Sequence, residues 1–190
     1  MIKAIIFDVG GVLKITDIKA TQENIISQFG LSPKLINQSY EKYFSIWQKG
    51  QMVESELWRN IINDYVADHQ NFQRIVKINQ EVYSIAADLK QRGYQTAIMS
   101  NVTLEDKALN EKIGLYKPFE IVILSTDIGL NKPDPKIYEI TLKKLDVKPQ
   151  EAIFVDDKKE FIKIAKSLGM HGIVYYNPSQ LKQEIEKLIQ

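Results

Sequence analysis

The chain has 190 residues, of which 44% are hydrophobic and 26% charged, with 25 Lys and Arg against 24 Asp and Glu. The net charge of +1 gives no electrostatic reason to expect a nucleic acid or an anionic membrane as a partner. The absence of cysteine excludes disulfides, thiolate nucleophiles and Cys-type zinc sites, and it fits an intracellular protein.

The first predicted element is a short apolar run over residues 2–7, followed by Asp8 and closed by Gly10 and Gly11. Such a run is typical of a buried strand, so Asp8 stands at its carboxyl end, where open α/β sheets bind ligands. A carboxylate withdrawn from water there needs a positive partner. The strand leaves no room for a signal peptide, and no apolar run approaches the roughly 20 residues of a membrane span, so we expect a cytoplasmic protein.

From about residue 17 to residue 79 the sequence predicts helices and no strand. Apolar residues recur at helical spacing over residues 18–29, and again from Pro33 and from Ser55 onward. The polar breaks that separate these helices fall at residues 49–50 and 66–71. We therefore expect an all-helical insert after the first strand.

From residue 80 onward, predicted strands alternate with predicted helices. The strands are expected at 94–99, 119–124, 152–155 and 171–175, and the helices at 82–90, after Asn101, and at 136–145, 161–168 and 181–189. This alternation predicts right-handed βαβ units and a parallel sheet. The expected fold is α/β, with a Rossmann-like parallel sheet core of residues 1–14 and 80–190 and a helical insert of residues 15–79.

Polar residues follow four of the predicted strands, and the carboxyl ends of parallel strands share one edge of the sheet. They are Asp8, Ser100, Asn101, Lys132, Asp156 and Asp157. Carboxylates from two strands suit Mg²⁺, whereas a hydroxyl, an amide and a lysine suit the oxygens of a phosphate. One carboxylate is then left for nucleophilic attack, while the metal and the lysine neutralise charge on the transferred group.

Each of these features also has a structural explanation when it is taken alone. Asp8 and the pair Asp156–Asp157 could cap helices, Ser100–Asn101 could form a turn, and Lys132 could be a solvated loop charge. Four such features in this order favour the functional interpretation.

Their order and spacing resemble the haloacid dehalogenase (HAD) superfamily over most of the chain. Residues 7–13 resemble its first motif, 99–101 the second, 129–138 the third and 154–157 the fourth. The helical insert resembles the small helical cap of the family's first subfamily. With Gly10 in its first motif, the chain most resembles the subgroup that contains glucose-1-phosphate phosphatase-like members.

The resemblance implies a role for each residue of the four motifs. Asp8 would be the nucleophile, forming an aspartyl-phosphate that water hydrolyses. Ser100 and Asn101 would bind the phosphoryl oxygens, and Lys132 would pair with both the phosphate and the nucleophile. The Mg²⁺ ligands implied are Asp8, the Gly10 carbonyl, Asp157, and Asp156 either through water or directly.

The chain departs from the family pattern in two places. The usual phosphatase carries a second Asp, the general acid, where this chain has Gly10, and general acid catalysis is typically worth about 10²–10⁴-fold. We therefore expect a substrate with a comparatively good leaving group, such as an anomeric sugar phosphate, an acyl phosphate or an aryl phosphate, with Asp17 as an alternative proton source. Phe161 stands where the subgroup often has Asn, which predicts looser support of the metal.

These observations predict a Mg²⁺-dependent phosphohydrolase that acts on a small phosphorylated metabolite, with a sugar phosphate among the candidates. One alternative is a weakly active relative that binds a phosphorylated ligand or a protein partner. The other is a haloacid dehalogenase, which would need no metal. The pair Asp156–Asp157 speaks against the dehalogenase.

Overall fold

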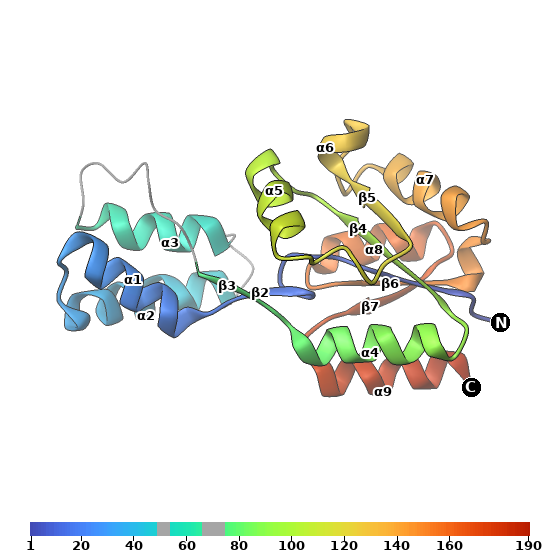
Figure 1. Cartoon of the computed structure of the whole chain (residues 1–190), viewed down its shortest axis with the longest axis horizontal. Coiled ribbons are helices and arrows are strands. Elements are labelled where there is room, and N and C mark those ends of the chain that lie inside the picture. The colour runs from blue at the N-terminus through green and yellow to red at the C-terminus, as the bar shows by residue number, and fades with distance from the viewer. Residues whose placement is uncertain (49–53, 66–74) are drawn as a thin grey trace. The chain divides into compact units, whose positions relative to one another are not determined.

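The computed structural model describes residues 1–48, 54–65 and 75–190 of the chain, shown from blue to red in Figure 1. The chain divides into two compact units. Met1–Ile15 and Ile78–Gln190 form the first, which we call the core unit. Thr16–Lys77 forms the second, which we call the helical unit. The predicted breaks at residues 49–50 and 66–71 lie outside the described residues.

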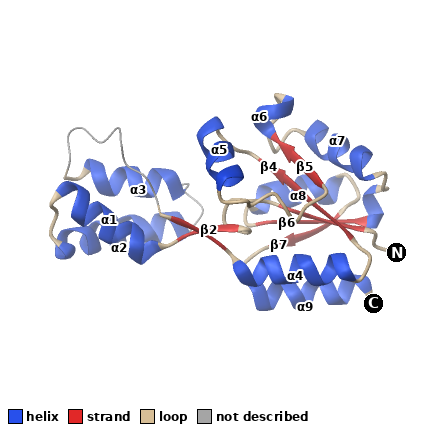
Figure 2. Ribbon diagram, viewed as in Figure 1, coloured by secondary structure: helices blue, strands red, loops and turns tan. Residues whose placement is uncertain are grey.

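Among the described residues of the core unit, five parallel strands form a sheet in the order β5-β4-β1-β6-β7 (Figure 2). The strands are β1 (Ala4–Phe7), β4 (Gln95–Ser100), β5 (Ile121–Leu124), β6 (Ala152–Asp156) and β7 (His171–Val174). The predicted parallel sheet is confirmed. The chain proceeds from β1 to β4 and β5 on one side and then crosses to β6 on the other, so the strand order reverses between β1 and β6.

Helices cover both faces of this sheet (Figures 1 and 2). Because successive side chains of a strand point to opposite faces, Ile5 and Phe7 pack in one apolar core, and Ala4 and Ile6 in the other. The first core includes α4 (Gln80–Gln91) and α9 (Pro178–Ile189), and the second includes α7 (Pro135–Leu145) and α8 (Lys159–Ser167). The remaining elements of this unit are α5 (Leu104–Lys112), α6 (Ser125–Ile128) and a 3₁₀ turn at Pro149–Glu151.

The helical unit contains α1 (Ile18–Phe29), α2 (Pro33–Gln48) and α3 (Glu54–Asn63). Their apolar faces meet in a separate core of Ile25, Ile36, Leu57, Trp58, Ile61 and Ile62. The end of α1 follows from the sequence, because Gly30 adopts the left-handed conformation with φ 64° that commonly terminates a helix. These three helices begin within a residue of their predicted starts.

The expectation of helices alone over residues 15–79 is wrong at both ends of that segment. The strands β2 (Lys14–Thr16) and β3 (Val76–Ile78) pair with each other in a second sheet. Strands of three residues are too short to show a readable alternation, and their pairing depends on residues that lie far apart in the sequence. The one-turn helix α6 was also missed, for the same reason of length.

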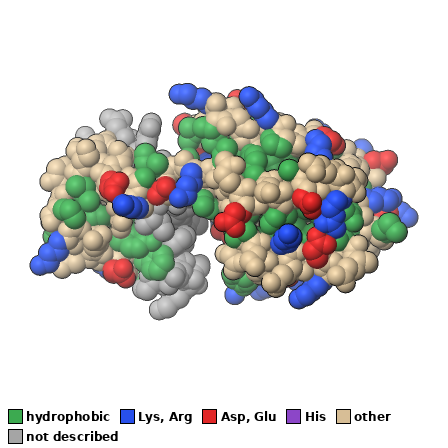
Figure 3. Space-filling view, turned by 60° about the horizontal axis from the view of Figure 1, so that its bottom comes forward, with side chains coloured by type: hydrophobic (Ala, Val, Ile, Leu, Met, Phe, Trp, Pro, Cys, Tyr) green, Lys and Arg blue, Asp and Glu red, His purple; other side chains and the backbone are tan. Residues whose placement is uncertain are grey.

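The surface of the core unit carries charges of both signs. On the face shown in Figure 3, acidic and basic side chains are intermixed over this unit. Arg92, which follows α4, pairs with Asp88 of the same helix and with Glu186 of α9. Across the described ranges, no helix combines the length and the apolar character that crossing a membrane requires.

Candidate active site

The candidate site lies at the carboxyl edge of the sheet, at the point where the strand order reverses. Asp8 follows β1 directly, and Asp156 is the last residue of the neighbouring strand β6. The register pairs Phe7 with Val155, and the Asp8 N–H donates to the Val155 carbonyl oxygen at 2.9 Å. Parallel pairing of two buried strands therefore brings the two carboxylates to one place.

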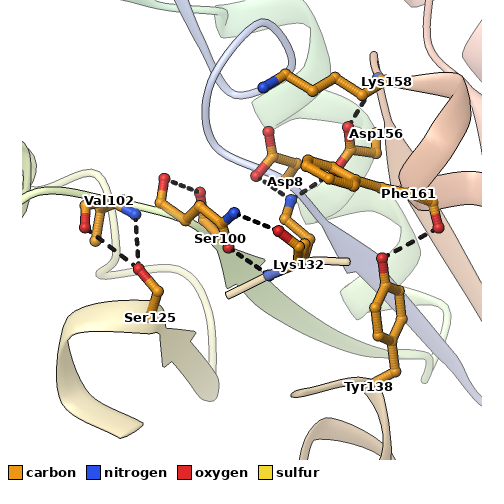
Figure 4. Close-up of polar contacts among 10 residues, drawn as sticks. Asp8, Ser100, Val102, Ser125, Lys132, Tyr138, Asp156, Lys158 and Phe161 are labelled. Carbon is orange, nitrogen blue, oxygen red and sulfur yellow. Dashed lines mark hydrogen bonds and ion pairs between the residues drawn. The ribbon is translucent and has the colours of Figure 1, made fainter. Parts of the chain in front are cut away.

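Lys132 lies between these two carboxylates (Figure 4). Its Nζ donates to Asp8 Oδ1 at 2.7 Å and to Asp156 Oδ2 at 2.5 Å. The Lys132 side chain is 1% exposed and that of Asp156 is 0% exposed. The other oxygen of Asp156, Oδ1, accepts the backbone N–H of Lys158 at 2.8 Å. Two carboxylates compensate the burial of the ammonium, so removal of Lys132 would leave two buried carboxylates without their partner, whereas removal of one carboxylate leaves the other bonded to the ammonium.

Asp157 completes an acidic cluster. One carboxylate oxygen each of Asp8, Asp156 and Asp157 lie within 4.8 Å of one another, and Asp157 is exposed whereas the other two are buried. Partial removal of the carboxyl groups from water, followed by the negative charge of Asp8, raises the pKa of Asp156 to about 8 and that of Asp157 to about 6. Because the cluster carries more negative charge than Lys132 neutralises, and because its donors are hard oxygens, these residues fit a Mg²⁺ ion.

Two glycines lie in the loop after Asp8, and they differ in the space that a side chain would find at each position. Gly11 has φ +76°, and a Cβ on it would overlap the Asp157 carboxylate, so a side chain here would displace Asp157. A Cβ on Gly10 would lie 3.9 Å from Asp8 Oδ2, which is an ordinary van der Waals distance. Gly10 is therefore next to the Asp8 carboxylate, at a position that has room for a side chain.

The Asn101 side chain is bonded to the backbone of Lys132. Its Nδ2 donates to the Lys132 carbonyl oxygen at 2.9 Å, and its Oδ1 accepts the Lys132 N–H at 2.8 Å. Such a two-way bond fixes the peptide groups on both sides of the lysine. Asn101 thus positions Lys132, and both halves of its amide are already bonded.

Two serine hydroxyls lie near the loop after β4, and only that of Ser125 holds the loop in place (Figure 4). Ser100, which is 1% exposed, has only a long contact of 3.5 Å from its hydroxyl to the Asn101 carbonyl among the described residues, so this hydroxyl is available for a ligand. Ser125 Oγ accepts the Val102 N–H at 3.0 Å and donates to the Val102 carbonyl at 3.3 Å. The loop is therefore fixed at two successive residues, Asn101 and Val102.

Asp17, considered as an alternative proton source, lies in the helical unit. Its carboxylate caps α1 by accepting the Ala20 N–H at 3.2 Å, and it pairs with Lys77 at 2.9 Å. The hydrogen bond from Lys77 lowers the pKa of Asp17. A carboxylate kept ionised in this way is a poor proton donor, so the structure favours a capping role for Asp17.

Sequence reasoning missed several residues that build the site. Ser125 could have been found from its place directly after a predicted strand. Tyr138 and Phe154 gave no separate signal, because their apolar spacing is that of ordinary core residues. Phe161 was singled out only for the metal site, and its contact with Lys132 was not predicted.

The comparisons with known proteins agree with this geometry. The family described as haloacid dehalogenase-like hydrolase matches residues 5–175. Mouse bifunctional epoxide hydrolase 2 is 33% identical over 116 residues, which are 58% of this chain. A sesquiterpene phosphatase of Aspergillus oryzae is 26% identical over 196 residues, which are 98% of this chain and 96% of that protein.

A solved structure shares the fold. It is a HAD family enzyme of Bacteroides thetaiotaomicron in complex with magnesium and inorganic phosphate, with a TM-score of 0.60 and 22% identity over 95% of this chain and 99% of that chain. The chain spans only part of the epoxide hydrolases that it matches, since the match covers 21% of the mouse protein and 39% of its pig counterpart.

Proposed function

Because this chain belongs to the haloacid dehalogenase-like hydrolase family, we propose that it is a Mg²⁺-dependent phosphohydrolase of a small phosphorylated metabolite. The observation that carries the proposal is the Lys132 ammonium, bonded to Asp8 and Asp156 at 2.7 and 2.5 Å. Asp157 adds a third carboxylate within 4.8 Å. The phosphatase among the relatives, and magnesium with phosphate in a protein of the same fold, support the same chemistry.

The proposed reaction has two steps, both of which use Asp8. Its carboxylate attacks the phosphorus, the bond to the leaving oxygen breaks, and an aspartyl-phosphate forms. Water then attacks this phosphorus, which releases inorganic phosphate and restores the carboxylate. Lys132 stays charged throughout, because burial is outweighed by Asp8 and Asp156, which raise its pKa. The ammonium thereby neutralises negative charge on Asp8 and on the phosphoryl group.

The remaining residues would bind the phosphate and the metal. The free hydroxyl of Ser100 would donate to a phosphoryl oxygen, and Asn101 would contribute mainly by fixing Lys132. Asp8, Asp157 and the Gly10 carbonyl would be direct Mg²⁺ ligands. Both oxygens of Asp156 are already bonded, which favours contact through water for this residue. The bound ion would supply positive charge to the phosphoryl oxygens.

The substrate class follows from the absence of a general acid at Gly10. The leaving oxygen would take its proton from solvent, so a substrate with an acidic leaving group, such as an anomeric, acyl or aryl phosphate, is favoured. We assign substrate selection to the helical unit, acting as a cap. A cytoplasmic location, expected from the sequence, remains a prediction.

The test is the hydrolysis of p-nitrophenyl phosphate with Mg²⁺ by the wild type and by Asp8→Asn. We expect turnover by the wild type and a loss of roughly 10⁴-fold or more in the variant. Binding of inorganic phosphate without any turnover would instead indicate a ligand-binding relative. Release of halide from a haloacid without Mg²⁺ would indicate a dehalogenase.

The leaving-group hypothesis has its own test. Hydrolysis of a series of aryl and alkyl phosphates should give kcat values that fall steeply as the pKa of the leaving alcohol rises. Equal rates on alkyl and aryl phosphates would show that another group donates the proton.

A further inference from the structure

Phe161 is in the first turn of α8, shortly after the acidic pair Asp156–Asp157 at the end of β6. Its side chain belongs to the core shared by α7 and α8, and the residue is 6% exposed. The sequence predicted a weaker metal site here, because the subgroup often has Asn at this position. The structure gives the ring a different neighbour, since the Lys132 Nζ lies 5.0 Å from its centroid.

Lys132 is enclosed by two kinds of group. Two carboxylates, those of Asp8 and Asp156, accept hydrogen bonds from its Nζ. Two aromatic rings provide further contacts, because the Nζ lies 5.3 Å from the centroid of Phe154 and 5.0 Å from that of Phe161. An ammonium that is 1% exposed has lost its water shell, and the negative face of an aromatic ring compensates part of that loss.

Tyr138 contacts both Phe154 and Phe161. Its hydroxyl donates to the Phe161 carbonyl oxygen at 3.1 Å (Figure 4). Its own ring packs edge-to-face on Phe154, with centroids 5.5 Å apart and an interplanar angle of 83°. Because Tyr138 is fully buried in the helix that follows the Lys132 loop, one segment supplies both the lysine and a residue that holds the Phe161 backbone and packs on the Phe154 ring.

We propose that Phe161 is a positioning residue for Lys132, and that its aromatic face holds the ammonium at the distance from Asp8 that phosphoryl transfer requires. This inference deepens the proposed function and rests on the role given there to Lys132. The exposed Lys158 ammonium lies 5.2 Å from the same ring, but in contact with water, where such an interaction is worth less.

The test replaces Phe161 with phenylalanines that carry one, two or three ring fluorines, which weaken the negative ring face with little change in shape. We expect kcat on p-nitrophenyl phosphate to fall stepwise, by about threefold to tenfold with three fluorines, with little change in KM. The thermal midpoint should stay within about 2 °C of the wild type. A residue that served only for packing would give a flat series.

A matched control uses the same fluorinated residues at Phe119, which is 7% exposed and packs on Phe7 and Tyr83. Within the described part of the chain, no ammonium lies over its ring, so its series should be flat. A flat series at Phe161, or an equal fall at Phe119, would overturn the proposal.

A second readout does not depend on catalysis. In protein with carbon-13 at the lysine ε-methylene, the Lys132 resonance, assigned by its loss in Lys132→Arg, should be shifted by the ring currents of its neighbours. Phe161→Leu should move it toward the position of an ordinary lysine. A resonance that does not move in Phe161→Leu would refute the contact itself, whereas absent turnover in the wild type would refute the proposed function alone.

Discussion

Each unit of the protein contains a cluster in which a lysine pairs with carboxylate. The pKa of the central carboxyl group is shifted in opposite directions in the two clusters. In the helical unit, Asp64 accepts hydrogen bonds from Ser39 at 2.8 Å, from Tyr43 at 2.8 Å and from Lys42 at 3.2 Å. Burial raises the pKa of Asp64, but the bonds from these three donors outweigh it, so that the pKa is lowered overall. In the core unit, burial and the charge of Asp8 raise the pKa of Asp156 instead.

The difference separates a cluster that stabilises the fold from one that is prepared for a ligand. Donors surround the carboxylate of Asp64, so folding gains from its charge. At the sheet edge, three carboxylates lie close together and two of them bond to the Lys132 ammonium, so folding brings like charges together. Such a surplus costs stability and persists where function needs it.

The largest expected effects come from exchanging a carboxylate for an amide in each cluster. Asp8→Asn should lower kcat by roughly 10⁴-fold or more, while its thermal midpoint stays equal to that of the wild type or rises, because one of the crowded charges is gone. Asp64→Asn should keep turnover and lower the midpoint by about 2–4 °C, because its donors lose a charged acceptor. Thermal melts and initial rates on both variants check the pair.

A loss of stability in Asp8→Asn as large as that in Asp64→Asn would break the contrast. It would mean that the Asp8 carboxylate stabilises the folded protein, and that Asp8 and Lys132 form an ordinary buried ion pair.

The next largest effect is the loss of stability on replacing the lysine of each cluster, and it should be much larger for Lys132 than for Lys42. Lys132→Met leaves two buried carboxylates without their partner, so we expect about 3–5 kcal/mol lower free energy of unfolding together with loss of turnover. Lys42→Met removes an exposed donor from an acceptor that keeps two others, and we expect a small change and full activity. Urea unfolding of both variants measures the difference, and equal losses would contradict it.

Magnesium should stabilise the folded protein by binding to the acidic cluster of Asp8, Asp156 and Asp157. Mg²⁺ at about 100 times its Kd should add about 2.7 kcal/mol to the free energy of unfolding, because it binds the folded state and neutralises the surplus charge. Asp157→Asn should reduce this gain, whereas Asp64→Asn should leave it unchanged. NaCl at equal ionic strength is the control, and an equal gain from NaCl would show general screening in place of a site.

The sequence was sufficient to predict the parts of this site that depend on strand ends. Asp8 and Asp156 each follow a buried apolar strand, and parallel pairing necessarily brings such ends together. Lys132 was predicted from its motif, and its bonds to both carboxylates agree with that motif.

The contacts that fix these groups could not be predicted from the sequence. The bonds from Asn101 to the Lys132 backbone and from Ser125 to Val102 join segments whose spacing carries no periodic signal. Phe161 has the spacing of an ordinary core residue, and only the three-dimensional structure places an ammonium on its ring. The short strand β3 was missed because its partner lies about 60 residues away, and such pairing leaves no local pattern.

The smallest expected effect concerns Gly10, where the sequence departs from the usual phosphatase. A Cβ fits at this position, 3.9 Å from Asp8 Oδ2, so Gly10→Asp should fold and place an acid beside the nucleophile. We expect kcat on alkyl phosphates to rise by about tenfold, which is less than a fully positioned acid supplies, with little change on aryl phosphates. The same substitution adds a fourth carboxylate to the cluster, so the thermal midpoint without Mg²⁺ should fall.

Gly10→Ala fills the same space without an acid and should change neither rate. If Gly10→Ala and Gly10→Asp behave alike, the missing carboxylate does not determine the choice of leaving group.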